Sequence, residues 1–310
     1  MNLAYDALEG AFNLLAREVR TDWMKGNGDL AGRLSAMATL EMRLLKARRT
    51  AAKMALQQFS TPLSISDAAM YVGHVMPGDV VMEPTAGTAN LVDGIRVYEP
   101  GATIRVNEFD PGRRSVLSGL GYSPTGIDVL GKDWVIGADG KKLPPNASVV
   151  ICNPPWGAYS TGKYGRAVHI PVFMNDWSQR FTFLIMQRLA DGGRFVDVMP
   201  VNWLYTVDRA TRGRKVVRSQ FLNWIEQNYT LRAIIESPEG AYKQRATDIG
   251  SLLVVIDKKK PDGTPALEAW GDQAPKNWED YADLLKQVGK DGKYGRTADD
   301  IATSQRGLTT

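Results

Sequence analysis

From Gln57 onward, short apolar runs alternate with stretches of helical periodicity, and this alternation limits the possible folds more than any other feature. Such alternation predicts a mostly parallel α/β sheet, because parallel strands are joined by helical crossovers. The stretch 177–189 has a helical stripe, and Asp191-Gly192-Gly193 after it is expected to stop the helix. The apolar runs cover residues 79–83, 103–107, 147–152, 194–199 and 251–256. Residues 57–258 are therefore expected to form one doubly wound domain.

Residues 1–56 lack this alternation and are predicted to form an α-hairpin. Two apolar stripes at helical spacing are separated by Gly26-Asn27-Gly28, which interrupts the pattern. The hairpin is expected to be a packing cap on the following domain, with DNA contact or dimerisation as the alternatives. The first stripe contains Leu3, Ala7, Leu8, Ala11, Phe12 and Leu15, and the second contains Leu34, Met37, Leu40, Leu44 and Leu45.

The composition excludes some classes of protein. The 310 residues are 44% hydrophobic and 23% charged, which is ordinary for a soluble globular chain. There is no apolar run of about 18 residues, so no membrane span is predicted. The N-terminus lacks the pattern of a secretory signal, and the single cysteine, Cys152, excludes an internal disulfide, so we expect a cytoplasmic protein. His74 and His169 are isolated, so no histidine-based metal site is predicted.

The most specific chemical signal is the motif Asn153-Pro154-Pro155-Trp156, directly after the apolar run 147–152. Two prolines fix two φ angles and remove two amide donors, so the carbonyl groups of the turn have no neighbouring donors. The turn is therefore a rigid patch of hydrogen-bond acceptors beside an amide and an aromatic face. Such a patch suits a planar group that carries an NH2, such as adenine, cytosine or a glutamine amide. The alternative is a chance turn in a loop.

This motif resembles the catalytic motif of S-adenosylmethionine-dependent amino-methyltransferases, Asn/Asp/Ser-Pro-Pro followed by an aromatic residue. Residues 83–91, Glu-Pro-Thr-Ala-Gly-Thr-Ala-Asn-Leu, resemble the cofactor loop Asp/Glu-Pro-x-x-Gly-x-Gly of the same family, with Ala89 in place of the second glycine. Residues 57–62 resemble the segment that ends in Thr-Pro and closes over the methionine part of the cofactor. This order of motifs is that of the gamma class of adenine-N6 DNA methyltransferases. It implies a Rossmann-like class I methyltransferase sheet.

The resemblance implies where the cofactor would bind. Glu108, after the apolar run 103–107, would accept both ribose hydroxyl groups, and Asp128 would accept the amino group of the cofactor adenine. Asp110 is expected to cap the helix that follows. No metal ion is implied. The predicted S-adenosylmethionine site contains Phe59, Thr61, Glu83, Pro84, Thr85, Gly87, Glu108, Asp128 and Asn153.

The resemblance also implies the chemistry of the motif. The strand before Asn153 would lie next to the strand before Glu83, because ligands bind at the switch point of a doubly wound sheet. The Asn153 side-chain oxygen and the Pro154 carbonyl would accept the two N–H groups of adenine N6 and push this nitrogen toward sp3 geometry. Pro155 belongs to the same rigid turn. The nitrogen would then attack the sulfonium methyl group, and positioning and electrostatics would supply most of the acceleration.

The implied partner is double-stranded DNA with a flipped base. A duplex hides the amino group, so the base would be flipped out and held between Trp156 and Tyr242; a core position for Trp156 and a surface loop for Tyr242 are the alternatives. The net charge of +4 and the pI near 9.0 are compatible with a polyanion. Two basic segments, 157–166 and 208–218, are expected near the site, and a solvated helix start is the alternative for the second. Phosphate contacts are predicted for Lys163, Arg166, Arg209, Arg212, Arg214 and Lys215.

The chain departs from the family in its C-terminal part. Sequence-specific gamma enzymes usually carry a sizeable target-recognition domain, but residues 259–310 are few, polar and weakly periodic, so an irregular tail is expected. We therefore expect relaxed specificity, a very short target sequence or a partner that supplies recognition. Compact methyltransferases of low specificity resemble phage and mobile-element enzymes that protect DNA from restriction. The alternatives are an RNA or protein glutamine acceptor, cytosine N4 as the target, and a non-catalytic nucleic-acid-binding role. The sequence does not indicate an oligomeric state.

Overall fold

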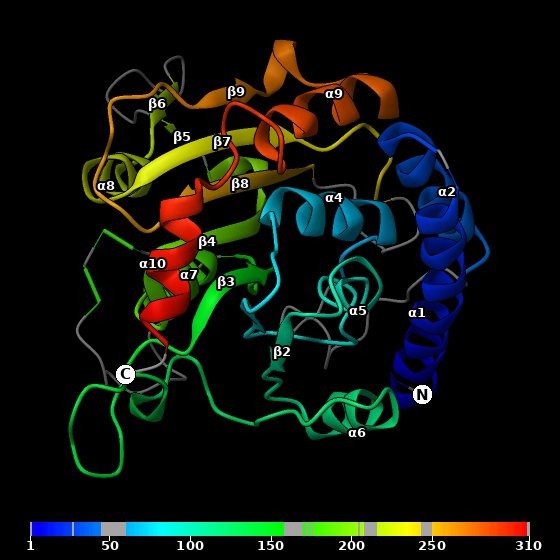
Figure 1. Ribbon diagram of the computed structural model, residues 1–310. Helices are drawn as coiled ribbons and strands as arrows, with labels where there is room; N and C mark the ends of the chain where they lie inside the picture. Colours follow the sequence, from blue (N-terminus) through cyan, green and yellow to red (C-terminus); the bar gives the residue numbers. More distant parts are fainter. Residues whose placement is uncertain are drawn as a thin grey trace.

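The computed structural model describes residues 2–26, 28–44, 60–157, 170–171, 173–174, 176–203, 205–207, 216–242 and 250–308. Figure 1 shows a central sheet with helices packed around it and α1 along one flank. The elements are α1 (Asn2–Lys25), α2 (Leu30–Met42), α4 (Leu63–Gly73), β1 (Val80–Glu83), α5 (Ile95–Tyr98), β2 (Thr103–Val106), α6 (Pro111–Gly119), β3 (Ala147–Cys152), α7 (Trp177–Met186), β4 (Leu189–Pro200), β5 (Tyr205–Val207), β6 (Val216–Arg218), α8 (Gln220–Asn228), β7 (Thr230–Glu236), β8 (Ser251–Asp257), β9 (Leu267–Ala269), α9 (Trp278–Val288) and α10 (Ala298–Arg306).

Within the described residues, seven strands form one sheet in the order β2-β1-β3-β4-β8-β7-β9. Strands β1 to β4 run parallel, whereas β8 is antiparallel to both of its neighbours. The predicted mostly parallel α/β sheet is therefore confirmed. The chain leaves β1 for β2 and then returns to β3 on the other side of β1, which creates a switch point. Val81 pairs with Val149, so Glu83, the last residue of β1, and Asn153, the first residue after β3, lie at the same edge of the sheet.

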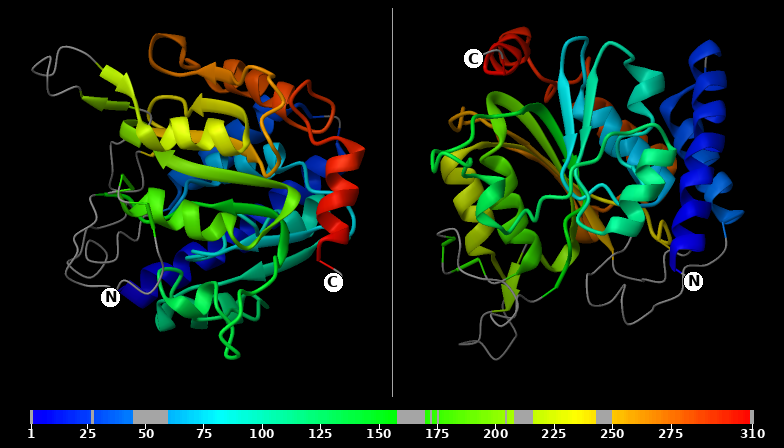
Figure 2. Two further views of the ribbon diagram at one scale, coloured as in Figure 1. Left: turned by 90° about the vertical axis from the view of Figure 1, so that its left-hand side faces the viewer. Right: turned by 90° about the horizontal axis from the view of Figure 1, so that it is seen from below.

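Helices cover both faces of the sheet, and this explains why the strands are apolar along nearly their whole length. Successive side chains of a strand point to opposite faces. Val149 and Ile151 belong to the core beneath α4 and α9, whereas Val150 and Cys152 belong to the core shared with α7 and α8. The two views in Figure 2 show the sheet between these helical layers. Residues 147–152 are accordingly buried without exception.

The predicted helix stop at residues 191–193 is wrong. The helix α7 ends at Met186, and Asp191-Gly192-Gly193 lies inside β4, where the pairing with β3 shifts register. Gly192 has a φ of 76°, and a Cβ atom on Gly193 would lie 2.8 Å from the Ser148 carbonyl oxygen. The two glycines therefore permit a bulge in a central strand, where backbones approach closely. In the sequence alone, a glycine pair that ends a helix looks the same as a glycine pair that permits a β-bulge.

Two helices, α1 and α2, lie within residues 1–56, where the α-hairpin was predicted, but α1 turns a different face to the domain from the one expected. Of the predicted apolar stripe, Leu15 is 38% exposed, and its neighbour Leu14 is 47% exposed. Helix α1 packs against α5 and α6 at the flank of the sheet. The face that α1 buries is mainly polar: Asp6, Glu9, Asn13 and Arg20 lie on it at helical spacing, together with Gly10 and Ala16.

Ion pairs explain why a polar face is stable in this interface. Arg20 Nη2 lies 2.7 Å from Asp67 Oδ1 of α4, and Arg17 Nε donates to Asp93 Oδ2 at 2.8 Å. The buried charges of Arg20, Asp67 and Asp93 thus have opposite partners, as burial of ionised groups requires. Spacing in the sequence identifies a helix face, but the partners that make a polar face suitable for burial lie about 50 to 75 residues away.

The C-terminal residues are not an irregular tail. Strand β9 extends the sheet beside β7, α9 packs against α2 and α4, and α10 packs against β4 and β3. The completely buried Arg194 holds these parts together: its guanidinium donates to Asp257 and to the carbonyl oxygens of Val72, Val288 and Tyr294. The polar composition concealed this packing, because α9 presents only a narrow apolar stripe. That stripe consists of Tyr281, Ala282, Leu285 and Val288.

His74 links the end of α4 to the C-terminal region and predicts a pH effect. Its Nδ1 accepts a hydrogen bond from the Arg296 backbone N–H, and burial together with Arg194 and Arg296 lowers its pKa from 6.5 to about 4. Because the unfolded chain binds this proton more readily, the contribution of His74 is complete above pH 6.5 and is lost as the pH falls toward 4. His74→Asn should therefore flatten the fall in stability between pH 6.5 and 4, measured by urea unfolding at each pH.

Asparagine suits this test because His74 has a φ of 45°, which asparagine tolerates, and its Oδ1 atom can accept the same hydrogen bond. The wild type and the variant are compared at each pH because buried Asp197 acts in the opposite direction. Its pKa is raised to about 7 by burial, so its contribution falls as the pH rises. An identical pH profile for both proteins would contradict the assignment to His74.

Among the helices of the described residues, none combines the length and the apolar character that a membrane span needs.

Candidate active site

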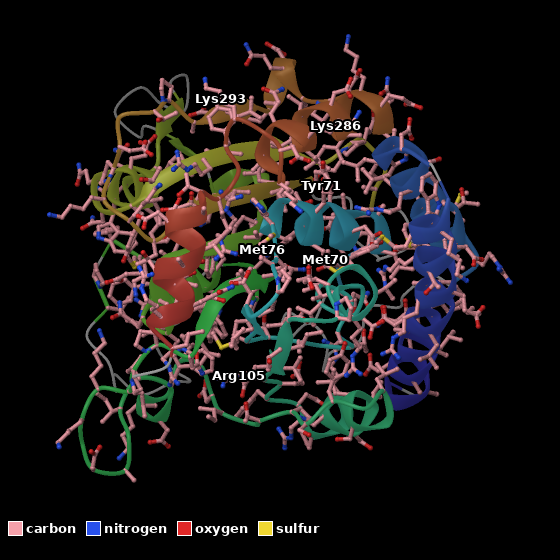
Figure 3. All side chains as sticks on the ribbon, viewed as in Figure 1. Met70, Tyr71, Met76, Arg105, Lys286 and Lys293 are labelled. Atoms are coloured by element: carbon pink, nitrogen blue, oxygen red, sulfur yellow. The ribbon has the colours of Figure 1, made fainter. Side chains whose placement is uncertain are left out.

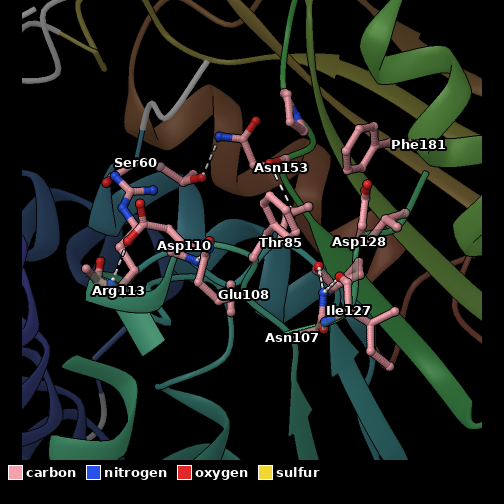
Figure 4. A pocket seen from close by; sticks show the side chains of 18 of the residues that line it. Ser60, Thr85, Asn107, Glu108, Asp110, Arg113, Ile127, Asp128, Asn153 and Phe181 are labelled. Carbon is pink, nitrogen blue, oxygen red and sulfur yellow. Dashed lines mark hydrogen bonds between the residues drawn. The ribbon is translucent and has the colours of Figure 1, made fainter. Parts of the chain in front are cut away.

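A cavity lies at the carboxyl ends of β1 and β3, where the switch point was predicted (Figure 4). Its wall is contributed by the segment before α4, the loop after β1, the end of β2, residues 127–130, the motif after β3 and the start of α7. Most of the predicted cofactor residues are therefore in one place. The lining consists of Ser60, Thr61, Pro84, Thr85, Ala86, Gly87, Thr88, Asn90, Asn107, Glu108, Phe109, Asp110, Arg113, Ile127, Asp128, Val129, Leu130, Asn153, Pro155, Trp177 and Phe181.

The loop after β1 bends around two residues in the left-handed region. Gly87 has a φ of 53° and Ala89 has a φ of 68°. A left-handed alanine costs about 1–2 kcal/mol, which explains why a glycine suits this position in the resembling pattern. Glu83 lies beneath the loop, is 2% exposed and does not line the cavity. Burial, followed by the nearby Glu108 and Asp93, raises the pKa of Glu83 well above its usual value.

Asn153 brings three of the predicted segments together. Its Nδ2 donates to Thr61 Oγ1 at 2.9 Å, and Thr85 Oγ1 donates to the Asn153 carbonyl oxygen at 3.3 Å (Figure 4). The amide plane of Asn153 is thus held by a residue 92 positions earlier in the chain. Pro155 lines the cavity beside Asn153, whereas Pro154 is buried behind it.

The two predicted carboxylates both line the cavity. Glu108 accepts hydrogen bonds from the Gly87 and Asp110 backbone N–H groups, each at 2.7 Å, and burial raises its pKa. Asp128 accepts a hydrogen bond from the Leu130 N–H at 2.9 Å. Asp110 caps α6 by accepting from the Arg113 N–H, as predicted. The cavity therefore has acceptors for hydroxyl and amino groups at two separate positions.

Helix α1 supports the cavity from behind through a chain of hydrogen bonds. Asn13 Nδ2 donates to the Thr88 carbonyl oxygen at 2.6 Å and to Asn90 Oδ1 at 2.9 Å, and Asn90 Nδ2 donates to the Thr61 carbonyl oxygen. Asn13 is completely buried. The polar face of α1 thus fixes the loop after β1 relative to Thr61. Sequence reasoning missed Asn13 because a lone asparagine within a helical stripe carries no distinct signal.

Sequence reasoning also missed three other cavity residues. Asn107 joins the end of β2 to the loop after β1, since its Nδ2 donates to the Pro84 and Ile127 carbonyl oxygens. Trp177 and Phe181 form one wall and stand one turn apart at the start of α7. The sequence contains a signal for these two residues. They are aromatic, lie four positions apart and follow Asp176, a residue type that favours helix starts, so they were expected on one face of a helix.

Trp156 and Tyr242, the predicted base-stacking pair, lie beside each other. They are 6% and 4% exposed, their ring centroids are 6.1 Å apart, and the rings are tilted by 49°. The Trp156 indole N–H donates to the Val198 carbonyl oxygen at 3.3 Å. Two rings that hold a base must be parallel and about 7–8 Å apart, because each lies in van der Waals contact with it. In this arrangement the two rings pack against each other, and a base between them requires one to move.

Beneath the motif, Cys152 is completely buried, and burial followed by Asp197 raises its thiol pKa. Its predicted inertness agrees with this environment. The part of the chain that the structure describes contains no group of three or more His, Cys, Asp or Glu side chains able to hold a metal ion. Seven predicted site residues lie outside the described residues: Phe59, Lys163, Arg166, Arg209, Arg212, Arg214 and Lys215.

No protein-family model and no curated protein matches the sequence. Solved structures do match. The modification protein of the type I restriction enzyme EcoKI has a TM-score of 0.54 and 16% identity, over 94% of this chain and 74% of that one. A Listeria monocytogenes protein described as a class I S-adenosylmethionine-dependent methyltransferase has a TM-score of 0.54 and 16% identity, over 87% and 80%.

A Vibrio vulnificus protein described as a modification subunit of a type I restriction enzyme has a TM-score of 0.51 and 19% identity. The match covers 82% of this chain but only 57% of that subunit. At such identities the similarity shows the fold alone. It confirms the predicted Rossmann-like fold of the class I methyltransferases.

Proposed function

We propose that this chain is an S-adenosylmethionine-dependent DNA methyltransferase that modifies the N6 atom of adenine. The observation that carries the proposal is the position of Asn153, at the end of β3 and on the wall of the cavity, bonded to Thr61 and next to Thr85. An acceptor-rich turn thus adjoins a cavity that suits a nucleoside. The fold of the structural neighbours is consistent with this assignment.

The chemistry of the cavity lining fits the cofactor. Trp177, Phe181 and Ile127 offer apolar surface to a planar purine, and Asp128 offers an acceptor for its amino group. Glu108 offers acceptors for ribose hydroxyl groups, although its oxygens now bond the Gly87 and Asp110 amides and would have to exchange these bonds. When bound, the cofactor supplies an electrophilic methyl group.

The motif residues act on the acceptor base. The Asn153 Oδ1 atom and the Pro154 carbonyl oxygen accept the two N–H groups of the adenine amino group, which localises the lone pair on nitrogen and makes it a better nucleophile. The bond from Asn153 Nδ2 to Thr61 fixes the amide plane before the base arrives, so that no reorganisation is needed during the reaction. Trp156 stacks on the base, with Tyr242 displaced to the other face.

DNA is the proposed acceptor because the neighbours include modification subunits of type I restriction enzymes. Residues 259–308 pack onto the catalytic sheet as β9, α9 and α10, so these residues do not form a separate target reader. We therefore propose relaxed or short target specificity, or a partner that supplies recognition. A role in protecting DNA from restriction would follow from such broad modification.

An acceptor assay tests the proposed function. Wild type and Asn153→Ala are each incubated with methyl-labelled S-adenosylmethionine and unmethylated duplex DNA, structured RNA or unmodified protein. Wild type should transfer label to DNA, and Asn153→Ala should transfer almost none. Label that enters only RNA or protein would contradict the DNA assignment and identify the alternative acceptor.

Trp177→Ala should weaken cofactor binding about tenfold, because the lost aromatic contact with a purine is worth about 1–1.5 kcal/mol. Trp177 is half-buried at the start of α7, so its truncation should affect folding less than truncation of Phe181. Calorimetric titration with S-adenosylhomocysteine measures the affinity. Trp224→Ala on α8, outside the cavity, is the matched control. If Trp177→Ala and the wild type bind S-adenosylhomocysteine with equal affinity, Trp177 does not contact the cofactor.

A further inference from the structure

Arg113, on the first turn of α6, has the environment of a ligand-binding residue. It is 5% exposed and lines the cavity. A Cβ atom on Gly87 would lie 3.4 Å from its Nη1, so the guanidinium reaches the loop after β1. In Figure 4, Arg113 and Ser60 lie on the opposite side of the cavity from Asp128 and Phe181.

The hydrogen-bonding capacity of Arg113 is not used within the described part of the chain. Its Nε and Nη2 atoms are buried and donate no hydrogen bond there. Nη2 lies 3.5 Å from Asp6 Oδ1 of α1, an ion pair without hydrogen-bond geometry. The nearby Glu108 carboxylate accepts from two backbone amides instead.

Among the described arginines, several have one buried guanidinium nitrogen without a hydrogen-bond partner, but Arg113 has two. Arg194 is also buried, but its guanidinium donates to Asp257 and to three carbonyl oxygens. A buried guanidinium without such partners costs free energy of folding. A residue of this kind at the wall of a cavity is explained if a ligand supplies the missing acceptors.

We propose that Arg113 binds the α-carboxylate of the amino-acid part of the cofactor; this inference rests on the proposed function. The cofactor is elongated, so with its adenine beside Asp128 and Phe181 and its ribose beside Glu108, its amino-acid end lies toward Arg113 and Ser60. A planar guanidinium matches a carboxylate with two parallel hydrogen bonds. A dianionic phosphate fits less well, because Glu108 and Asp6 already place negative charge next to Arg113.

Two ligands that differ in this carboxylate test the inference. S-adenosylhomocysteine carries the amino-acid group, whereas 5′-methylthioadenosine has the same adenine and ribose without it. Arg113→Met should weaken binding of S-adenosylhomocysteine about 10- to 100-fold, as for loss of a charge-assisted pair. Binding of 5′-methylthioadenosine should change less than about twofold. Arg105→Met, the same substitution at the exposed edge strand β2, should leave both affinities unchanged (Figure 3).

Arg113→Lys keeps the charge but not the planar pair of donors. If Arg113→Met does not fold, this second variant still tests the inference. It should weaken binding of S-adenosylhomocysteine alone, by a smaller factor. Equal losses for both ligands in either variant would overturn the inference and make Arg113 a support for Glu108 or the fold. Unchanged affinity for S-adenosylhomocysteine would overturn it as well. A wild type that binds neither ligand would refute the proposed cofactor itself, a separate outcome.

Discussion

Asn153→Ala should lower the single-turnover rate of methyl transfer by at least about 100-fold, because it removes one of two oriented acceptors of the target amino group. The turn itself should survive, since Pro154 and Pro155 fix its backbone and the Asn153 carbonyl still accepts from Thr85. The rate is measured with enzyme in excess over DNA and saturating cofactor, so that a weaker affinity for the cofactor does not enter the result.

Asn153→Asp is the matched control, because aspartate keeps an acceptor oxygen at the same distance from the backbone. It should retain more activity than Asn153→Ala. The Thr61 hydroxyl can donate to the new carboxylate, so the contact between the two side chains should be kept with its direction reversed. Asn153→Ala with more than about half of the wild-type single-turnover rate would exclude Asn153 from the chemical step.

Arg296→Ala should lower the free energy of unfolding by about 3–5 kcal/mol, the usual result of leaving one partner of a buried ion pair alone. Arg296 Nη1 donates to Asp79 Oδ2 at 2.7 Å and to the His74 carbonyl oxygen, and Nη2 donates to Ser304 Oγ. Both side chains of the ion pair are completely buried. Arg296 therefore connects the C-terminal region to the amino-terminal end of β1. Urea unfolding of the wild type and the variant measures the change in the free energy of unfolding.

Arg306→Ala, the same substitution at an exposed position of α10, should change the free energy of unfolding by less than about 0.5 kcal/mol. A similarly small loss in Arg296→Ala would show that residues 259–308 are an addition to a domain that is stable without them. It would also favour the expected C-terminal tail over an integral part of the domain. The large loss that we predict would make this region part of the domain that contains the seven-stranded sheet.

The strands and the position of the loop after β1 were predictable because their signals are local. The run 147–152 is apolar at every position but Ser148, and its burial on both faces follows from this composition. The motif at 153–156 could be placed directly after a buried strand from the sequence. Its two prolines fix two φ angles and remove two amide donors, so a rigid turn was expected there. The meeting of Asn153 with the Glu83 loop followed from the topology of a doubly wound sheet.

The remaining features depend on contacts between distant residues. The polar face of α1 is buried because Asp67 and Asp93 face it, and nothing in residues 1–26 shows that those carboxylates are near. The glycine pair at 192–193 is ambiguous between a helix stop and a bulge until β3 is placed beside it. Arg113 follows a predicted cap and looks like an ordinary surface arginine in the sequence, yet it is buried at the cavity.

The most direct test of the central claim identifies the modified atom. DNA treated with the enzyme and S-adenosylmethionine is digested to nucleosides, which are separated and identified by mass. We predict N6-methyl-deoxyadenosine from the wild type and none above background from Asn153→Ala. N4-methyl-deoxycytidine would contradict adenine as the target, and the absence of any methylated deoxynucleoside, with cofactor binding intact, would contradict the DNA methyltransferase assignment as a whole.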